Sequence, residues 1–250
     1  MTYPSAPQTP PPYATQPPPR RQRRLVNLPY VTYFMIASCV VVYLAQIIFQ
    51  AGYGTDLLAQ FGDKNNAAIL QGQYWRFFTP MWLHGSILHI GFNMYALLIF
   101  GNNLERFYGH FRFLLLYILG GFAGNVVSFM MSPAQSLGAS TAIFGLIAAQ
   151  GVFIYQNREM IRNSRALLIN TILIAGINLV LGLSPGIDNW GHLGGLIGGL
   201  AFAWSAGPVW EQTGQFGPRT APRSTSRVVL VAIGVFIVFS ALAALKILTH

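Results

Sequence analysis

Two long stretches of this sequence contain no charged side chain. Asp, Glu, Lys and Arg are all missing from residues 25–55 and from residues 77–104. Because about 20 apolar helical residues cross the hydrocarbon core of a bilayer, each stretch is long enough for a transmembrane helix. Charged residues make up 8% of the chain, whereas soluble domains carry about a quarter. The sequence therefore predicts an all-α polytopic membrane protein.

Seven apolar segments are assigned as membrane spans. They are residues 30–49, 83–103, 113–131, 140–155, 166–183, 190–204 and 228–245. The fourth and the sixth are short for a crossing, so we expect them to begin inside the membrane, below a water-filled cavity. Aromatic residues suited to the membrane interface gather before the second span, so we expect part of this first loop to be half-embedded. They are Tyr74, Trp75, Phe77, Phe78 and Trp82.

The formal charge is +9, and the positions of the basic residues along the chain indicate how it is oriented in the membrane. With seven spans and an internal N-terminus, 12 of the 15 basic residues fall in cytoplasmic segments, and only Lys64, Arg76 and Lys246 fall outside. This bias follows the positive-inside rule. We therefore expect the lipid bilayer, and no nucleic acid, as the partner of the basic charge.

The chain divides into four predicted regions. Residues 1–24 are expected to form a disordered Pro/Arg-rich cytoplasmic tail, which is either a spacer or a ligand for a proline-recognising partner. Residues 25–206 form a six-helix core, residues 207–227 a cytoplasmic linker, and residues 228–250 a seventh transmembrane helix. Short loops and the lack of a cleavable signal favour a bacterial plasma membrane with a cytoplasmic N-terminus. Cys39, the single cysteine, excludes an intramolecular disulfide.

Polar residues inside membrane helices are costly, so the few in these spans are candidates for function. His89 and Asn93 stand four residues apart on one helical face, and His84 lies just before them. Ser140 begins the fourth span and His192 begins the sixth. In the assumed topology, all five lie toward the external side of the membrane.

A serine, an imidazole and further hydrogen-bond donors at one level satisfy the requirements of acyl transfer. Ser140 is the predicted nucleophile, and His192 accepts its proton and returns it to the leaving amine. His89 and Asn93 are expected to stabilise the oxyanion, at roughly 3–4 kcal/mol per donor. With Glu105 and Glu159 on the cytoplasmic side, we expect no third member and hence a two-residue dyad.

Each candidate also has a structural interpretation. A lone serine at a helix start is more often an N-cap, and intramembrane His and Asn often only link helices. His84 is equally consistent with a solvent-facing position or a supporting place in the pocket. Glu105 is expected to pair with a nearby Arg and Arg76 to order the first loop, while His110 and His250 are expected to be loop and tail residues.

The order and spacing of these residues resemble the motifs of the rhomboid family of intramembrane serine proteases, over about residues 30–206. The motifs are Gly138-Ala139-Ser140, His84-x4-His89-x3-Asn93, His192-x2-Gly195-x3-Gly199, Trp75-Arg76 and Leu104-Glu105-x3-Gly109. The resemblance implies a six-helix core, a Ser-His dyad, and an oxyanion hole lined by the second-span His and Asn. It also implies substrates that are transmembrane helices, no cofactor or metal, and an aromatic residue on the catalytic imidazole, here Phe144.

Two residues depart from the family pattern, and one of the departures matters. The family usually has glycine after the nucleophile, where this chain has Thr141, whose side chain could crowd the oxyanion site. Alanine is frequent before the histidine, where this chain has Gly191, which should be harmless. The alternative prediction is therefore a catalytically inactive rhomboid-like protein that binds transmembrane helices.

Two further alternatives concern the histidines and the glycines. His84, His89 and His192 could ligate a transported metal, although the spans hold no carboxylate and no repeated half. Small residues spaced four apart in the sixth span favour close internal packing over dimerisation. The oligomeric state, the gating motion and the identity of the substrate stay open.

Overall fold

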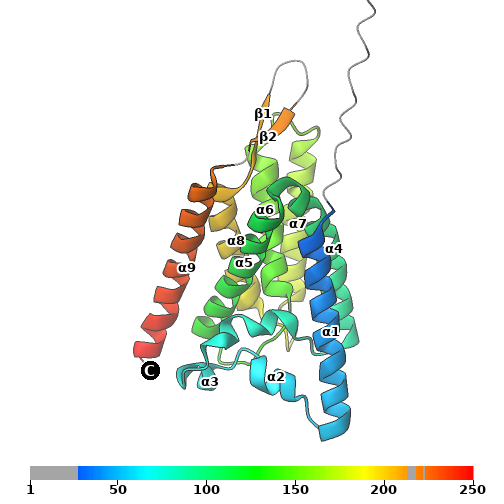
Figure 1. The fold of residues 1–250 in the computed structure, drawn as a ribbon, viewed down its shortest axis with the longest axis vertical. Coiled ribbons are helices and arrows are strands. Elements are labelled where there is room, and N and C mark those ends of the chain that lie inside the picture. The colour runs from blue at the N-terminus through cyan, green and yellow to red at the C-terminus, as the bar shows by residue number, and fades with distance from the viewer. Residues whose placement is uncertain (1–27, 213–217, 222, 250) are drawn as a thin grey trace, which may run out of the picture.

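The computed structural model describes residues 28–212, 218–221 and 223–249 (Figure 1). The predicted tail, residues 1–24, lies outside the described residues, as does His250. The elements are α1 (Tyr30–Tyr53), α2 (Leu57–Gly62), α3 (Asn66–Leu70), η1 (Tyr74–Phe77), η2 (Thr79–Trp82), α4 (Ile87–Tyr108), α5 (His110–Met131), α6 (Ser140–Gln156), α7 (Ser164–Leu181), α8 (Asn189–Ala206), β1 (Val209–Gln212), β2 (Pro218–Ala221) and α9 (Thr225–Leu248).

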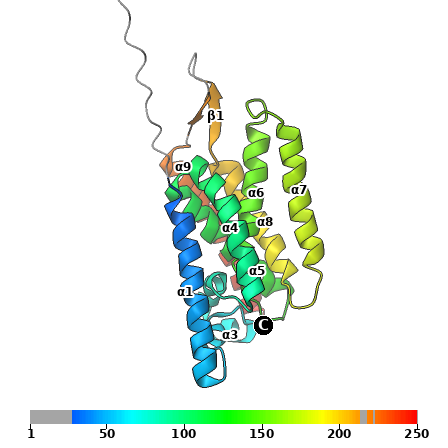
Figure 2. The ribbon, with the colours of Figure 1, turned by 90° about the vertical axis from the view of Figure 1, so that its right-hand side faces the viewer.

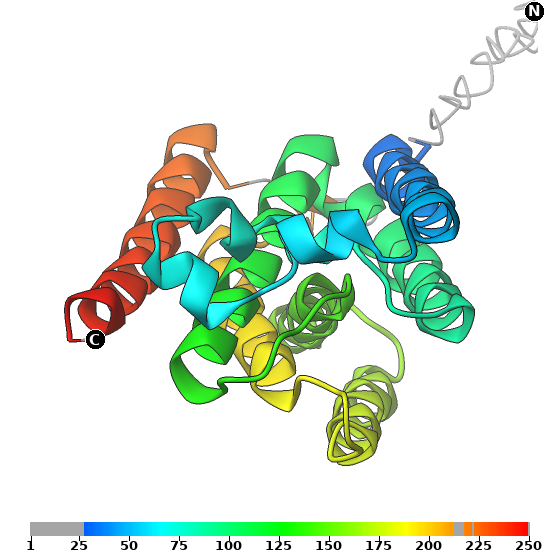
Figure 3. The ribbon, with the colours of Figure 1, turned by 90° about the horizontal axis from the view of Figure 1, so that it is seen from below.

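The bundle has two distinct ends (Figures 1 and 3). At one end, which we call the loop end, residues 54–86 fold into the short helices α2, α3, η1 and η2. At the opposite end, which we call the hairpin end, β1 and β2 pair antiparallel, with Val209 opposite Ala221. This hairpin lies within residues 207–227, which the sequence predicts to be a plain linker.

Helix α6 stands at the centre of the bundle, against α5 and α8 (Figures 2 and 3). Glycines let the three backbones approach closely. A Cβ on Gly145 would lie 3.1 Å from the Cα of Gly120 on α5, and one on Gly199 would lie 2.4 Å from the Cα of Gly145. Gly194 and Gly198 approach α5 in the same way. The glycines of α8 therefore serve internal packing, as predicted.

Helices α1, α7 and α9 lie on the outside of the bundle (Figure 3). Their apolar windows are 22%, 6% and 28% buried, against 72% for α5. Among the described residues, α1, α4, α5, α7 and α9 are long and apolar enough to cross a membrane, while α6 is shorter. The chain is a helical, multi-pass membrane protein, and the count of seven crossing helices stays a prediction.

Within the part of the chain that the structure describes, the partners of Glu105 are two backbone N–H groups and a histidine, where the sequence predicts an arginine. Its carboxylate accepts hydrogen bonds from the backbone N–H groups of Val31, at 2.9 Å, and Thr32, at 2.7 Å. It also contacts His110 Nδ1 at 2.5 Å, so His110 is a partner of α4 and not a plain loop residue. The first N–H groups of a helix have no acceptor within the helix. Glu105 supplies that acceptor for α1 and so fixes the start of α1 against the end of α4.

Candidate active site

Ser140 and His192 meet at the loop end of the bundle. His192 Nε2 lies 2.9 Å from Ser140 Oγ, within hydrogen-bonding distance. The ring of Phe144, one turn further along α6, stacks on the imidazole with 4.2 Å between ring centroids and an angle of 13°. His192 is 7% exposed, and its Nδ1 is buried without a hydrogen-bond partner among the described residues. The ring is therefore oriented by Ser140 and by stacking.

The N-terminus of α6 carries no side-chain cap. Its N-cap residue is Ala139, so Ser140 is the first helical residue and is not an N-cap. By contrast, Asp56, Ser86 and Asp188 cap α2, α4 and α8 with side-chain oxygens. The first N–H groups of an α-helix lack intrahelical partners and carry partial positive charge. Next to Ser140, those groups can hold an anion.

His89 also approaches Ser140. Gly138 has φ of 133°, a conformation open to glycine, and a Cβ there would lie 2.7 Å from His89 Nε2 and 3.7 Å from Ser140 Oγ. The backbone N–H of Gly85 donates to His89 Nδ1 at 3.4 Å. An accepting Nδ1 leaves the proton on Nε2, so Nε2 is the donor on the side of Ser140.

Asn93 and His84 support this side of the site. Asn93 Nδ2 donates to the carbonyl of His89 at 2.8 Å. His84 is 1% exposed, and its ring lies 5.2 Å from that of His89 in an edge-on arrangement. The structure thus places His84 in the interior, where the sequence left solvent exposure open. Gln46 of α1 holds the His84 backbone, accepting from its N–H at 3.1 Å and donating to its carbonyl at 3.3 Å.

Thr141 points between α5 and α8. A Cβ on Gly124 of α5 would lie 2.6 Å from Thr141 Cβ, and one on Gly191 of α8 would lie 3.0 Å from Thr141 Cγ2. The Thr141 side chain therefore fills space that these two glycines leave open. Ser140, by contrast, faces His192. The methyl group of Thr141 packs against α5 and α8, so the structure gives no sign of the crowding expected from the sequence.

Lys64 holds the segment that leads into Ser140. Its backbone forms a bridge with Ser136, and its Nζ donates to the carbonyls of Ser132, at 3.0 Å, and Ala134, at 2.6 Å. Burial lowers the pKa of Lys64 to about 8, although the negative charge of Asp188 opposes the decrease. A buried lysine thus joins the first loop to the loop that carries the nucleophile.

Arg76 orders the first loop, as the sequence predicts. Its guanidinium forms an ion pair with Asp63 at 2.6 Å and donates to the carbonyls of Asp63, at 2.9 Å, and Gln60, at 2.7 Å. Burial raises the pKa of the Asp63 carboxyl, while the charge of Arg76 lowers it. Such a multiply bonded guanidinium fixes the chain on both sides, so α2 is tied to η1.

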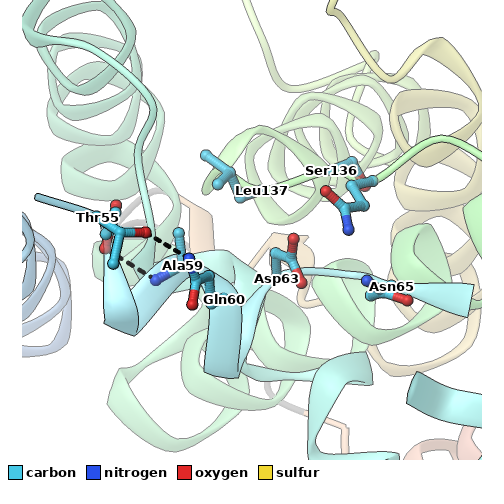
Figure 4. A pocket seen from close by; sticks show the side chains of 9 residues that line it. Thr55, Ala59, Gln60, Asp63, Asn65, Ser136 and Leu137 are labelled. Atoms are coloured by element: carbon cyan, nitrogen blue, oxygen red, sulfur yellow. Dashed lines mark hydrogen bonds between the residues drawn. The ribbon is translucent and has the colours of Figure 1, made fainter. Parts of the chain in front are cut away.

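A pocket of about 420 Å³ borders the loop before Ser140 (Figure 4). Residues of α2 and its neighbours form one wall, and Ser136 and Leu137 face them. The lining residues are Thr55, Asp56, Ala59, Gln60, Asp63, Asn65, Gln135, Ser136 and Leu137. Leu137 precedes the Gly138-Ala139-Ser140 motif. The pocket is therefore next to the loop that leads into Ser140, and neither Ser140 nor His192 lines it.

Asp188 is a polar neighbour of the dyad that the sequence-based reasoning did not consider. It caps α8 one turn before His192, accepting from Gly191 N at 2.9 Å and from Ser128 Oγ at 2.5 Å. It precedes the predicted sixth span, so the rarity of polar residues within the spans does not single it out. The available signal was its place four residues before His192, at the start of a helix.

The histidines do not gather as metal ligands. Among the described residues, no group of three or more His, Cys, Asp or Glu side chains is arranged to hold a metal ion. His84 and His89 are neighbours, whereas His192 is engaged by Ser140. The three imidazoles therefore do not converge on one point.

Comparison with known proteins agrees with this arrangement. A family described as "Rhomboid domain" matches residues 71–208. "Rhomboid protease GluP" of Bacillus subtilis (strain 168) is 41% identical over 208 residues, which are 83% of this chain and 39% of that protein. In Arabidopsis thaliana, "RHOMBOID-like protein 9, chloroplastic" is 40% identical over 60% of this chain and 35% of its own length.

A further Arabidopsis thaliana relative, "RHOMBOID-like protein 6, mitochondrial", is 33% identical over 73% of this chain and 64% of its own length. The chain thus spans between about a third and two thirds of the length of these relatives. The matched region includes every residue of the site, from His84 to His192. The chain belongs to the rhomboid family.

Proposed function

We propose that this protein is an intramembrane serine endopeptidase that cleaves the transmembrane segments of membrane-protein substrates. The observation that carries the proposal is the 2.9 Å contact between Ser140 Oγ and His192 Nε2, made at a helix N-terminus without a side-chain cap. A nucleophile, its base and anion-binding N–H groups then lie at one point, as acyl transfer requires. A named protease at 41% identity supports the same reaction class.

In the first step, His192 Nε2 accepts the hydroxyl proton while Ser140 Oγ attacks the carbonyl carbon of the scissile bond. Phe144 keeps the ring in the plane that faces Ser140. Because His192 is almost fully buried, little water competes for the proton. The product of this step is a tetrahedral intermediate with a negatively charged oxygen.

The oxyanion is stabilised by donors around Ser140. The candidate donors are the free N–H groups at the start of α6 and His89 Nε2–H, and Asn93 is fixed beside His89. Preorganised donors of this kind contribute roughly 3–4 kcal/mol each in other acyl-transfer enzymes. His192 then protonates the leaving amine, and a water activated by the same imidazole hydrolyses the acyl-enzyme.

The substrates are helices within a bilayer, and the loop end faces the outside of a bacterial plasma membrane. Support comes from the dyad's place at the loop end, below the first loop, and from the basic residues, most of which lie toward the cytoplasm in this orientation. A transmembrane helix exposes its backbone only where it unwinds. We therefore expect cleavage near the membrane surface, at residues that destabilise a helix.

The test is cleavage of a substrate with one transmembrane helix by purified protein in liposomes. We expect Ser140→Ala and His192→Ala each to lower kcat by at least about a thousandfold, because both act in one proton transfer. Leu248→Met, an exposed change on α9, is the matched control. Cleavage by Ser140→Ala at the wild-type rate contradicts the proposal.

The alternative is a protein that binds transmembrane helices without cutting them, and it rests on Thr141. The packing of Thr141 between Gly124 and Gly191 favours the enzyme, because the side chain leaves the face of Ser140 open. The same assay separates the two. An inactive wild type that binds the substrate helix, with activity gained in Thr141→Gly, would favour the alternative.

A further inference from the structure

The dyad faces an electrostatic difficulty at the start of α8. His192 is the fourth residue of that helix, and it becomes a cation when it accepts the proton of Ser140. The positive end of a helix dipole disfavours a cation in the first turn. A buried charge without a partner is also costly, and Nδ1 has no hydrogen-bond partner among the described residues. The reaction therefore needs a negative charge nearby.

Asp188 is placed to supply that charge. It lies one turn before His192, and its backbone carbonyl accepts from the His192 N–H at 3.1 Å. Both carboxylate oxygens are fixed, Oδ1 by Gly191 N at 2.9 Å and Oδ2 by Ser128 Oγ at 2.5 Å. A carboxylate held in this way keeps its position relative to the imidazole throughout the reaction.

The other charges near this point do not replace it. Among the described residues, Lys64, between α2 and α3, and His89 on α4 are further titratable neighbours of Asp188 or His192, and neither can be negative. Lys246 of α9 acts on Lys64 and adds a further positive charge. At the loop end, Asp63 is paired with Arg76, and Asp56 accepts from Gln46 and Ala59. Asp188 is left to balance the imidazolium.

We propose that Asp188 is a positioning residue of the protease, which stabilises the His192 imidazolium through its charge and is itself held by Ser128. It is not a third member of a hydrogen-bonded triad, because His192 Nδ1 has no hydrogen-bond partner among the described residues. The inference rests on the proposed endopeptidase activity.

The test compares kcat, KM and the pH profile of kcat for wild type, Asp188→Asn and Asp188→Glu. Asn caps helices about as well as Asp, so Asp188→Asn removes the charge and keeps the cap. We expect its kcat to fall about tenfold at constant KM. The rising limb of its profile should move to lower pH, because the imidazolium has lost its counter-charge. Asp188→Glu should keep the wild-type profile.

Asp56→Asn is the matched control, since Asp56 caps α2 at the same end of the bundle and should leave the pH profile unmoved. Asp188→Ser, a second neutral cap, replaces Asp188→Asn if that variant does not fold. The inference is overturned if the neutral variant keeps the wild-type kcat and pH profile. It is also overturned if Asp188→Glu and Asp188→Asn lose kcat equally and neither pH profile shifts. Activity of Ser140→Ala in the same assay would instead reject the proposed function.

Discussion

The two residues next to Ser140 and His192 in the sequence, Thr141 and Gly191, also pack against each other. Thr141 follows the nucleophile and Gly191 precedes the histidine, and a Cβ on Gly191 would lie 3.0 Å from Thr141 Cγ2 and 2.8 Å from Asp188 Oδ2. In the sequence, they are two separate departures from the family pattern. In the structure they are linked by packing, because the larger residue on α6 occupies the space that the smaller residue on α8 leaves free.

We expect Gly191→Ala to lower the free energy of unfolding by about 1–3 kcal/mol, because the added methyl overpacks this contact. In the double variant with Thr141→Gly, part of the lost stability should be recovered, because the Thr141 methyl group that the added Cβ would contact is absent. The measurement is a double-mutant cycle on unfolding in detergent. Additive effects of the two substitutions contradict a shared space.

The sequence was informative about individual polar residues in the spans. Ser140, His89, Asn93 and His192 stood out because polar groups are rare in lipid, and the structure brings their elements together. Asp188 precedes the sixth span, so its sequence signal is its place four residues before His192 at the start of a helix. The sequence could not reveal the reciprocal contact of Gln46 with His84, because it depends on how distant segments dock. Whether these residues catalyse a reaction stays a prediction.

At the scale of elements, α9 is joined to the core by more than apolar contact. Lys246, near its end, donates from Nζ to the carbonyls of Phe129, at 2.7 Å, and Met130, at 3.0 Å. Its ammonium also lies 5.0 Å from the centre of the Phe129 ring. These carbonyls end α5, where a cation is favoured by the helix dipole. Lys246 was an exception to the charge bias in the sequence, and the structure gives it this partner.

Lys246→Met should lower the free energy of unfolding by about 2 kcal/mol, because two carbonyls lose a charged donor while the length of the side chain is kept. Leu245→Met, an exposed neighbour on the same helix, serves as control. The measurement is denaturant unfolding in detergent. Equal midpoints for the two variants would mean that the lysine does not hold α9.

Hydrophobic runs predicted the elements well, and their ends less well. The first span continues to Tyr53, four residues beyond the predicted end, and α9 begins at Thr225 instead of residue 228. The ends are set by caps, such as Gly54 after α1 and Ser224 before α9, which apolar windows do not detect. The hairpin of β1 and β2 was missed because its strands are four residues long.

For the whole molecule, the charge distribution predicts an orientation. Among the described residues, most arginines lie toward the hairpin end, and the proposed site lies at the loop end. Because Cys39 is the single cysteine and is 0% exposed, the native chain should give little background with thiol reagents. Introduced cysteines can therefore report which end faces the outside of the cell.

We expect a membrane-impermeant maleimide to label Gln71→Cys, at the loop end, in intact cells. Arg162→Cys, in the connection between α6 and α7 near the hairpin end, should react only after the membrane is opened. Both positions are exposed, so accessibility within the protein is matched. The unmodified chain is the blank. Labelling of Arg162→Cys in intact cells would show that the hairpin end faces the outside, which contradicts the proposed topology.

The close approach of Thr141, Gly124 and Gly191 also limits the order in which this chain can change. Replacing Thr141 by glycine first leaves a small void, which a folded protein tolerates at a modest cost. Placing alanine at 124 or 191 first forces atoms into contact, since the added Cβ would lie 2.6 Å from Thr141 Cβ in one case and 3.0 Å from Thr141 Cγ2 in the other. Of the possible mutational routes between this chain and one with glycine after the nucleophile, the accessible ones begin at Thr141.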